Sequence, residues 1–410
     1  MSDKLRAGII GIGFIGAVHV EQLRRLGTVE VAALATTTDA QKKADALQVS
    51  RGYVSYKDMI DNERLDCVHI CTPNDTHFEM AMYALEQGVN VVCEKPMTRT
   101  VGEAEQLLNF AQKKKLVHAV NFHCRFYPMA YQMREMVRSG QLGDVYTIHG
   151  GYLQDWLLYD TDYNWRLEPE LSGESRAFAD IGSHWIDLAE FVSGQKVTEV
   201  LADFATFHKT RKKPKKAIGT FSGMALRSED FNEVPVQTED YATVLFRFDN
   251  GAHACCNITQ VLAGRKNQMI LAIGGSKCSL HWDSELSNEV WIGRRDGPNG
   301  QLVKDPSILS EATKKIVSYP GGHVEGFPDT FKQNFKQIYA AIAAVKSGSG
   351  GGDHSGGDYG ASGGDHSRGN GDCSTGSAGA DYADFSAGLR EMLICDSVVK
   401  SARERRWISV

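Results

Sequence analysis

Three side chains of proton-transferring types occur in distinctive local patterns. Lys95 directly follows Val89–Cys93, a short apolar run, as the middle residue of a Glu-Lys-Pro triplet. Asp180 and His184 are four positions apart in a stretch whose apolar residues recur at helical spacing, so they share one helix face. Amines, imidazoles and carboxylates are the usual general acids and bases. We therefore take Lys95, Asp180 and His184 as candidate catalytic residues, and we expect Asp187, three positions after His184, to orient the imidazole.

The strand before Lys95 explains why this lysine would meet a ligand. The β-branched, non-alternating residues of Val89–Cys93 are typical of a parallel strand buried on both faces. In an open sheet of such strands, ligands bind in the crevice beyond the carboxyl ends. Pro96 favours an extended backbone at Lys95. We therefore expect Lys95 to face a ligand crevice.

A glycine-rich turn near the N-terminus predicts what that crevice binds. Gly11, Gly13 and Gly16 form a Gly-x-Gly-x-x-Gly motif between a predicted strand, Arg6–Ile10, and a predicted helix, Ala17–Leu26. In this context the first glycine permits a tight turn, the second lets the backbone approach a pyrophosphate, and the third allows close helix packing. The helix N-terminus supplies amide donors to the phosphates. The motif therefore predicts dinucleotide binding.

The choice between NAD and NADP stays open at this stage. The acidic residue that usually binds the ribose 2′-hydroxyl, about twenty positions after the motif, is missing. The second predicted strand instead ends in Thr36, Thr37 and Thr38, with Lys42 and Lys43 soon after. Hydroxyls and ammonium groups suit a 2′-phosphate, so we predict NAD or NADP as cofactor.

The chain divides into two halves with different sequence patterns. Strands and helices alternate through residues 1–122, which predicts a Rossmann domain with a doubly wound parallel sheet. Residues 123–346 and 381–410 are rich in alternating strands and predict an α+β domain on a large, mostly antiparallel sheet for substrate binding and oligomerisation. Residues 347–380 are rich in glycine, serine and aspartate and predict a flexible insertion. The basic run 208–216 is expected to be a solvated loop.

Composition excludes several classes of protein. The 410 residues carry a net charge of −6, with acids and bases interspersed, which argues against nucleic-acid binding. No apolar run is long enough to span a membrane, and we expect no signal peptide and a cytoplasmic location. The nine cysteines are scattered and form no Cys-x-x-Cys pair, so we expect neither disulfides nor a metal site. The open face of the antiparallel sheet is a candidate interface for a homo-oligomer, a dimer or tetramer.

The order of these motifs resembles the Gfo/Idh/MocA family of oxidoreductases. The similarity rests on the glycine-rich turn, Glu94–Pro96, Trp165–Arg166 and the Asp-x-Gly-x-His-x-x-Asp stretch 180–187, and it extends over nearly the whole chain outside 347–380. Within the family, residues 156–192 most resemble sugar dehydrogenases of the levoglucosan dehydrogenase kind. One departure lies at 172–176, where many members have a glycine cluster and this chain reads Ser-Gly-Glu-Ser-Arg. This difference alters the expected substrate pocket.

The motifs and the resemblance together give a set of candidate site residues. The resemblance matches Lys95, Asp180 and His184 to the family's catalytic lysine, aspartate and histidine. The candidate cofactor-binding residues are Gly11, Gly13, Phe14, Ile15, Gly16, Thr36, Thr37, Thr72, Pro73, Asn74, His77, Glu94, Lys95, Asn121, Trp165 and Arg166. The candidate substrate-binding residues are Lys95, Arg125, Tyr163, Arg166, Asp180 and His184.

Aromatic and basic residues of the second half suit a carbohydrate. Trp156, Tyr163 and Trp165 offer flat faces to the C–H side of a sugar, and Arg166 and Arg176 can donate to its hydroxyl groups. We therefore expect an NAD(P)-dependent dehydrogenase that acts on a secondary alcohol of a sugar, anhydrosugar or cyclic polyol. In this reaction His184 or Lys95 takes the hydroxyl proton, the other donates a hydrogen bond, and Asp180 tunes the pair.

Two other functions fit the same sequence. A glycoside-cleaving enzyme with tightly bound NAD would oxidise its substrate only transiently and would release a free sugar. A non-catalytic sensor of sugar or dinucleotide would use the scaffold without chemistry, although it would not need Lys95, Asp180 and His184 together.

Overall fold

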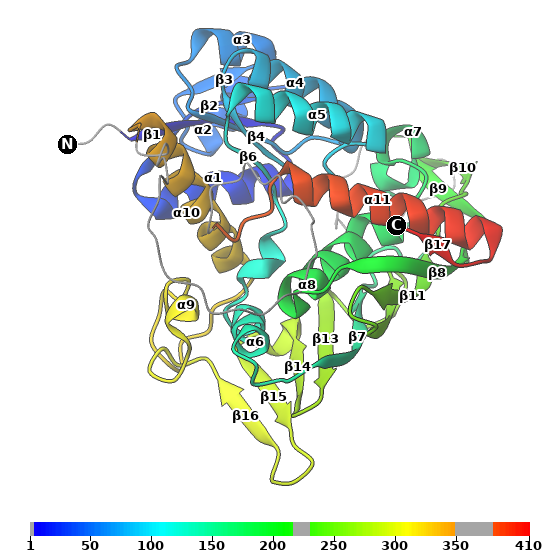
Figure 1. Cartoon of the computed structure of the whole chain (residues 1–410). Coiled ribbons are helices and arrows are strands. Elements are labelled where there is room, and N and C mark those ends of the chain that lie inside the picture. The colour runs from blue at the N-terminus through cyan, green and yellow to red at the C-terminus, as the bar shows by residue number, and fades with distance from the viewer. Residues whose placement is uncertain (1–3, 216–229, 349–379) are drawn as a thin grey trace.

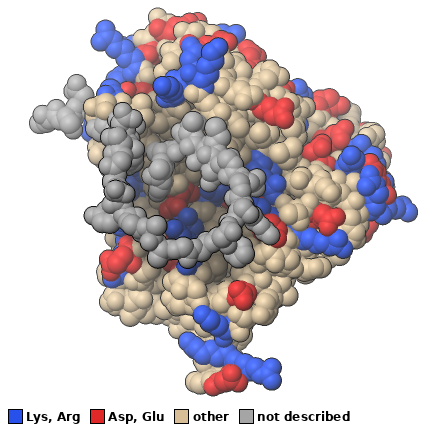
Figure 2. Space-filling model, in the orientation of Figure 1, with Lys and Arg blue, Asp and Glu red and all other residues tan. Residues whose placement is uncertain are grey.

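The computed structural model describes residues 4–215, 230–348 and 380–410 (Figure 1). The predicted flexible segment 347–380 lies outside these ranges except for three residues at its ends. No helix in the described ranges has the length and apolar character to cross a membrane. Basic and acidic side chains are interspersed over the described residues of the face shown in Figure 2.

The first half forms a six-stranded parallel sheet in the order β3-β2-β1-β4-β5-β6. Its strands are β1 (Leu5–Ile10), β2 (Val29–Ala35), β3 (Arg51–Tyr53), β4 (Cys67–Ile70), β5 (Asn90–Cys93) and β6 (His118–Val120). Its helices are α1 (Phe14–Leu26), α2 (Ala40–Ala46), α3 (Tyr56–Asn62), α4 (His77–Glu86) and α5 (Val101–Lys114). The strand order reverses between β1 and β4, and such a switch point opens a ligand crevice at the carboxyl ends of the strands. The predicted parallel sheet is confirmed.

The second half is built on a nine-stranded sheet in the order β16-β15-β14-β13-β7-β12-β11-β8-β17. Its strands are β7 (Val145–Leu153), β8 (Val197–Ala205), β11 (Tyr241–Phe248), β12 (His253–Thr259), β13 (Gln268–Gly275), β14 (Ser279–Asp283), β15 (Glu289–Gly293), β16 (Gly300–Val303) and β17 (Ile408–Ser409). All neighbouring strands are antiparallel except β7 and β12. The mostly antiparallel sheet is therefore confirmed. The second half also contains the helices α6 (Pro128–Arg138), α7 (Pro169–Ser172), α8 (Ser183–Ser193) and α9 (Glu311–Lys314).

The basic run 208–216, of which 208–215 are described, is exposed or partly exposed apart from Arg211, as predicted, but its middle is a strand rather than a loop. Its middle forms β9 (Thr210–Pro214), which pairs with β10 (Phe231–Pro235). The side chain of Arg211 is fully buried and forms an ion pair with Asp240 at 2.9 Å. Arg211 is therefore buried as the partner of the buried Asp240 carboxylate, because a buried charge needs a partner of opposite charge.

The two halves are joined by helices from the end of the chain. The α10 helix (Phe327–Lys346) packs against α1, so a late segment completes the first core. The α11 helix (Phe385–Glu404) contacts α5 of the first half and β8 of the second (Figure 1). The division of the chain into domains at residues 122, 346 and 381 stays a prediction.

The α10 contact predicts a stability effect. Phe335 is fully buried against the first sheet, so Phe335→Ala removes a large core side chain. We expect it to lower the free energy of unfolding by about 3–5 kcal/mol in urea denaturation. Val345→Ala lies on the same helix but is 50% exposed, and we expect less than about 0.5 kcal/mol. Equal effects of the two substitutions would mean that α10 contributes little to this core.

Candidate active site

A cavity of about 760 Å³ brings the three candidate catalytic side chains together. One side is formed by the turn after β1 and by the ends of β2, β4 and β5. The other side is formed by β7, α8, α10 and the π-helical turn Phe178–Gly182 that precedes α8. The predicted site residues that line it are Gly11, Gly13, Phe14, Ile15, Thr36, Thr37, Thr72, Pro73, Asn74, Glu94, Lys95, Trp165, Arg166, Asp180 and His184.

Lys95 reaches across the cavity to Asp180. Its Nζ lies 2.9 Å from Asp180 Oδ1 and also contacts the Asp180 backbone carbonyl oxygen. Arg166 Nε donates to the same Oδ1 at 2.9 Å. Burial opposes ionisation of Asp180, but the charges of Arg166 and Lys95 outweigh it and hold the pKa of Asp180 well below its usual range. The carboxylate is therefore ionised and fixes the ammonium group of Lys95.

A buried network holds Asp180 from behind. Gln260 Nε2 donates to Asp180 Oδ2 at 2.9 Å, while Gln260 Oε1 accepts from Arg176 Nη1 at 2.9 Å. Arg176 also pairs with Asp240, and the side chains of Arg176 and Asp240 are both fully buried. The suggestion that Arg176 donates to a substrate was wrong, because this buried carboxylate binds its guanidinium away from the cavity. The network instead fixes the orientation of the Gln260 amide.

His184 enters the cavity as a neutral imidazole. It is 6% exposed, and burial lowers its pKa well below the ordinary value, with the charge of Lys95 acting in the same direction. The nearby carboxylate of Asp180 opposes this shift but does not overcome it. A neutral imidazole carries one lone pair, so His184 presents an acceptor nitrogen at neutral pH.

The expectation that Asp187 orients His184 was wrong. Both Asp187 oxygens accept hydrogen bonds from Arg125, with Nε 2.9 Å from Oδ2, so this carboxylate is already engaged. The same ion pair holds Arg125 outside the cavity lining, contrary to its predicted role in substrate binding. Tyr163 also lies outside the lining, where its hydroxyl donates to Glu168 at 3.3 Å.

Gly16 and His77, which were predicted to bind the cofactor, lie outside the cavity lining and contact the protein backbone instead. A Cβ at Gly16 would lie 2.0 Å from the carbonyl oxygen of Gly11, so glycine allows α1 to pack against the turn. His77 is fully buried, with one ring nitrogen 2.9 Å from the Pro96 carbonyl oxygen and the other 2.9 Å from that of Thr72. His77 thus links the loops that follow β4 and β5.

Asn121, the last predicted residue outside the lining, supports Glu94. Its Nδ2 donates to Glu94 Oε1 at 2.6 Å, and His19 Nε2 lies 3.0 Å from the same oxygen. Burial would raise the pKa of Glu94, but the contacts with His19 and Asn121 and the charge of Lys95 lower it to about 2. Glu94 therefore brings a permanent negative charge to the cavity wall beside Lys95.

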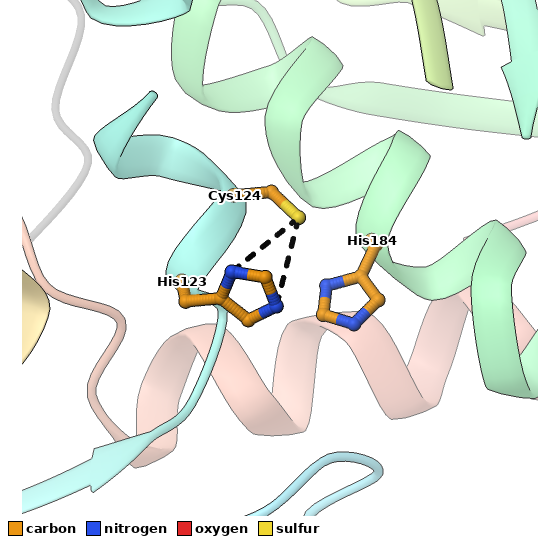
Figure 3. A group of neighbouring side chains, drawn as sticks. All are labelled: His123, Cys124 and His184. Atoms are coloured by element: carbon orange, nitrogen blue, oxygen red, sulfur yellow. Dashed lines mark hydrogen bonds between the residues drawn. The ribbon is translucent and has the colours of Figure 1, made fainter. Parts of the chain in front are cut away.

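His184 also belongs to a buried group with His123 and Cys124 (Figure 3). One potential ligand atom from each of the three lies within 4.8 Å of the others. Such a set can bind a transition metal only if the cysteine is a thiolate. Burial raises the pKa of the Cys124 thiol, with the charge of Asp187 adding to the effect, so the thiol stays protonated. A metal at this place would therefore have to displace the proton of a buried thiol.

Sequence reasoning missed several polar residues of the cavity. Gln154 follows β7 and Asn267 precedes β13, and these strands pair so that the two residues are neighbours. Asn267 Oδ1 accepts from Tyr152 at 2.9 Å and from Gln154 at 2.7 Å, which leaves its Nδ2 as the donor it can offer to the cavity. Gln154 Oε1 in turn accepts from Trp156 at 2.7 Å. Only the pairing of β7 with β13, which single-strand patterns do not reveal, brings these residues together.

The opposite end of the cavity suits a dinucleotide. Gly11 has a φ of 88°, a left-handed backbone that favours glycine, and a Cβ on Gly13 would meet no heavy atom within 4 Å. The turn therefore leaves open space for phosphates at the start of α1. Thr36 and Thr37 line this end, and Lys43 Nζ lies 3.3 Å from Thr36 Oγ1.

Comparison with known proteins agrees with this geometry. The NAD-binding Rossmann domain of the Gfo/Idh/MocA oxidoreductase family matches residues 5–122, and the C-terminal domain of that family matches residues 131–281. Levoglucosan dehydrogenase from Pseudarthrobacter phenanthrenivorans is 28% identical over 71% of this chain and 76% of its own. D-glucoside 3-dehydrogenase from Escherichia coli is 32% identical over 47% of this chain and 55% of its own.

A solved structure shows the same fold. An inositol dehydrogenase homologue from Azotobacter vinelandii, crystallised with NAD+, superposes with a TM-score of 0.83 at 23% identity, over 100% of this chain and 98% of that chain. The two family domains together match more than half of the present sequence. The chain therefore belongs to the Gfo/Idh/MocA family of NAD-binding oxidoreductases.

Proposed function

We propose that the protein transfers a hydride between a secondary alcohol of a sugar, anhydrosugar or cyclic polyol and a nicotinamide cofactor. The observation that carries this proposal is the meeting of Lys95, Asp180 and His184 in the cavity that the glycine-rich turn also lines. The relatives with assigned names support the substrate class, since they include a levoglucosan dehydrogenase and a D-glucoside 3-dehydrogenase.

Each of the three catalytic candidates has a distinct role in this proposal. Nicotinamide, when bound, supplies the hydride chemistry. Neutral His184 accepts the proton of the substrate hydroxyl, and Lys95 donates a hydrogen bond to the same oxygen. Asp180 holds the Lys95 side chain in position through the contact of 2.9 Å. The side chains of Lys95, Asp180 and His184 are each largely buried, which strengthens these interactions.

The polar residues at the far end of the cavity suit further hydroxyl groups of such a substrate. Asn267 offers an amide donor there, and Trp156 and Trp165 also line the cavity. Arg166 lies over the Trp165 ring, with its guanidinium carbon 4.5 Å from the ring centroid. Flat rings beside hydrogen-bond donors match the two faces of a pyranose or cyclitol.

The end of β2 favours NADP as the cofactor in our proposal. Lys43 Nζ contacts the hydroxyls of Thr36 and Thr38 at 3.3 and 3.5 Å, and within the described residues it forms no ion pair. Residues 34–38 carry no carboxylate, and Asp39, which follows them, is exposed just before α2. The cluster therefore offers one positive charge and several hydroxyls to that phosphate.

One experiment tests the function as a whole. The full-length protein is incubated with sugars, anhydrosugars and cyclic polyols plus NAD or NADP, while nicotinamide absorbance at the reduced band and the organic products are both followed. Reduction of the cofactor with formation of a ketone supports the proposal. Release of a free sugar without net reduction would identify a glycoside-cleaving enzyme, and ligand binding without product would identify a sensor.

Oligomerisation through the open face of the nine-stranded sheet and a cytoplasmic location remain predictions. Size-exclusion chromatography with light scattering measures the first.

Lys95→Ala is expected to lower turnover by about 10²–10⁴-fold, because it removes the donor to the reacting oxygen. The affinity for the dinucleotide, measured by calorimetry, should be retained, since the glycine-rich turn is untouched. Lys113→Ala changes an exposed lysine on α5 and serves as the control. Wild-type turnover in Lys95→Ala would exclude this lysine from the chemistry.

Lys43→Ala is expected to raise KM for NADP by about tenfold or more and to leave KM for NAD nearly unchanged. A hydrogen bond to a charged group contributes roughly 1.5–3 kcal/mol, and 1.4 kcal/mol corresponds to about tenfold. Lys42→Ala is the matched control, because Lys42 is the neighbouring exposed lysine of α2. Equal changes for both cofactors would contradict a 2′-phosphate site at Lys43.

A further inference from the structure

The hydrogen bonds of Thr330 determine which nitrogen of His123 carries a proton. The Thr330 hydroxyl donates its only hydrogen to the Phe327 carbonyl oxygen at 2.7 Å. Thr330 Oγ1 also lies 2.8 Å from His123 Nδ1, and here it must act as the acceptor. His123 Nδ1 therefore carries a hydrogen. Burial lowers the pKa of His123 to about 3, so the ring is neutral, and its Nε2 presents a lone pair that lies 3.9 Å from Cys124 Sγ and on the side of His184 (Figure 3).

The two nitrogens of His184 have different surroundings. Nδ1 is buried and has no hydrogen-bond partner among the described residues. Figure 3 shows that this nitrogen, next to the ring carbon that carries the side chain, lies on the side of His123 and Cys124. The two imidazole rings are 5.2 Å apart between centroids. The other nitrogen, Nε2, is the one left to serve the cavity that His184 lines.

The charge distribution of the His123 ring selects one form of His184. A neutral imidazole has one N–H and one lone pair, and their positions are exchanged between its two tautomers. With a lone pair on His184 Nδ1, two lone pairs would face each other in a buried, low-dielectric place. With a hydrogen there, the positive end of the N–H dipole lies on the side of the His123 lone pair, which Cys124 Sγ also approaches at 3.9 Å. The second arrangement has the lower electrostatic energy.

We propose that His123 is a positioning residue that keeps His184 in the tautomer with its hydrogen on Nδ1 and its lone pair on Nε2, facing the cavity. This inference rests on the proposed function for its catalytic meaning, because only a lone pair on Nε2 can accept the substrate proton. It also gives His123 the role that the sequence suggested for Asp187. Thr330 belongs to the same chain of contacts, since it fixes His123.

The first test reads the tautomer without any turnover. The full-length protein is labelled with ¹⁵N-histidine, and the His184 signals are assigned by their loss in His184→Asn. We expect Nδ1 to show the shift of a protonated ring nitrogen and Nε2 that of a nitrogen with a lone pair. Wild-type His184 with its hydrogen on Nε2 would overturn the proposal, whatever the activity of the enzyme.

The second test compares variants of His123. His123→Phe keeps a ring beside Phe331, against which His123 stacks at 4.0 Å, but offers no acceptor. We expect the His184 hydrogen to move to Nε2 and kcat to fall by about 10- to 100-fold. The factor should be the same from pH 6.5 to 8.5, because a tautomer ratio does not depend on pH. His123→Gln returns an amide oxygen and should recover part of the loss.

The other groups around His184 are the same in the wild type, His123→Phe and His123→Gln, so they do not account for a difference in tautomer or kcat among these proteins. They are Lys95, Asp180, Cys124 and, from β7, Tyr152. An unchanged tautomer and an unchanged kcat in His123→Phe would overturn the proposal.

Thr330 and zinc supply two further checks. Thr330→Val removes the acceptor of the His123 hydrogen, whereas Thr330→Ser keeps it, so we expect a lower kcat in the first than in the second. Both remain informative if His123→Phe does not fold. Zinc chloride is also titrated into the protein and into Cys124→Ser. Stoichiometric zinc binding that is lost in Cys124→Ser would mean that His123 Nε2 and His184 Nδ1 are metal ligands, and it would overturn the proposal. If the tautomer of His184 depends on His123 but the protein turns over none of the substrates, the proposed function is refuted and this inference stands.

Discussion

The ion pair between Lys95 and Asp180 is the contact on which the candidate site depends, because it joins the two halves of the chain at the cavity. The lysine comes from the carboxyl end of a parallel strand, and the aspartate comes from a π-helical turn of the second half. Both side chains are largely buried, so each charge requires the other. The pair fixes one wall of the cavity against the other at the point where the catalytic candidates meet.

The pair does not stand alone, because fixed groups surround both partners. On one side Glu94 is ionised and is held by Asn121 and His19. On the other side Gln260 connects Asp180 to the buried pair of Arg176 and Asp240. A carboxylate supported in this way cannot turn to follow a moving partner, so the site is organised before any ligand arrives. Such preorganisation is how enzymes stabilise charge in a transition state.

Much of the fold was predictable, and so was the meeting of the three catalytic candidates, but their supporting contacts were not. Buried parallel strands have short apolar runs, and the residues that follow them fall at one sheet edge, which is why Lys95 was found. The spacing of Asp180 and His184 gave a shared helix face. Asp187 was misjudged because its partner Arg125 lies far away in sequence. His123 was overlooked because its role depends on Thr330, 207 positions later.

The late helices that complete the first core have a consequence for how the chain is made. Synthesis of the first 122 residues yields six strands, yet the aromatic face of α10 that covers them is encoded more than 200 positions later. The nascent nucleotide-binding half therefore leaves the ribosome with apolar surface still uncovered. It can become a finished structure only when nearly the whole polypeptide has emerged, so the half with the familiar dinucleotide motif is not a separable module.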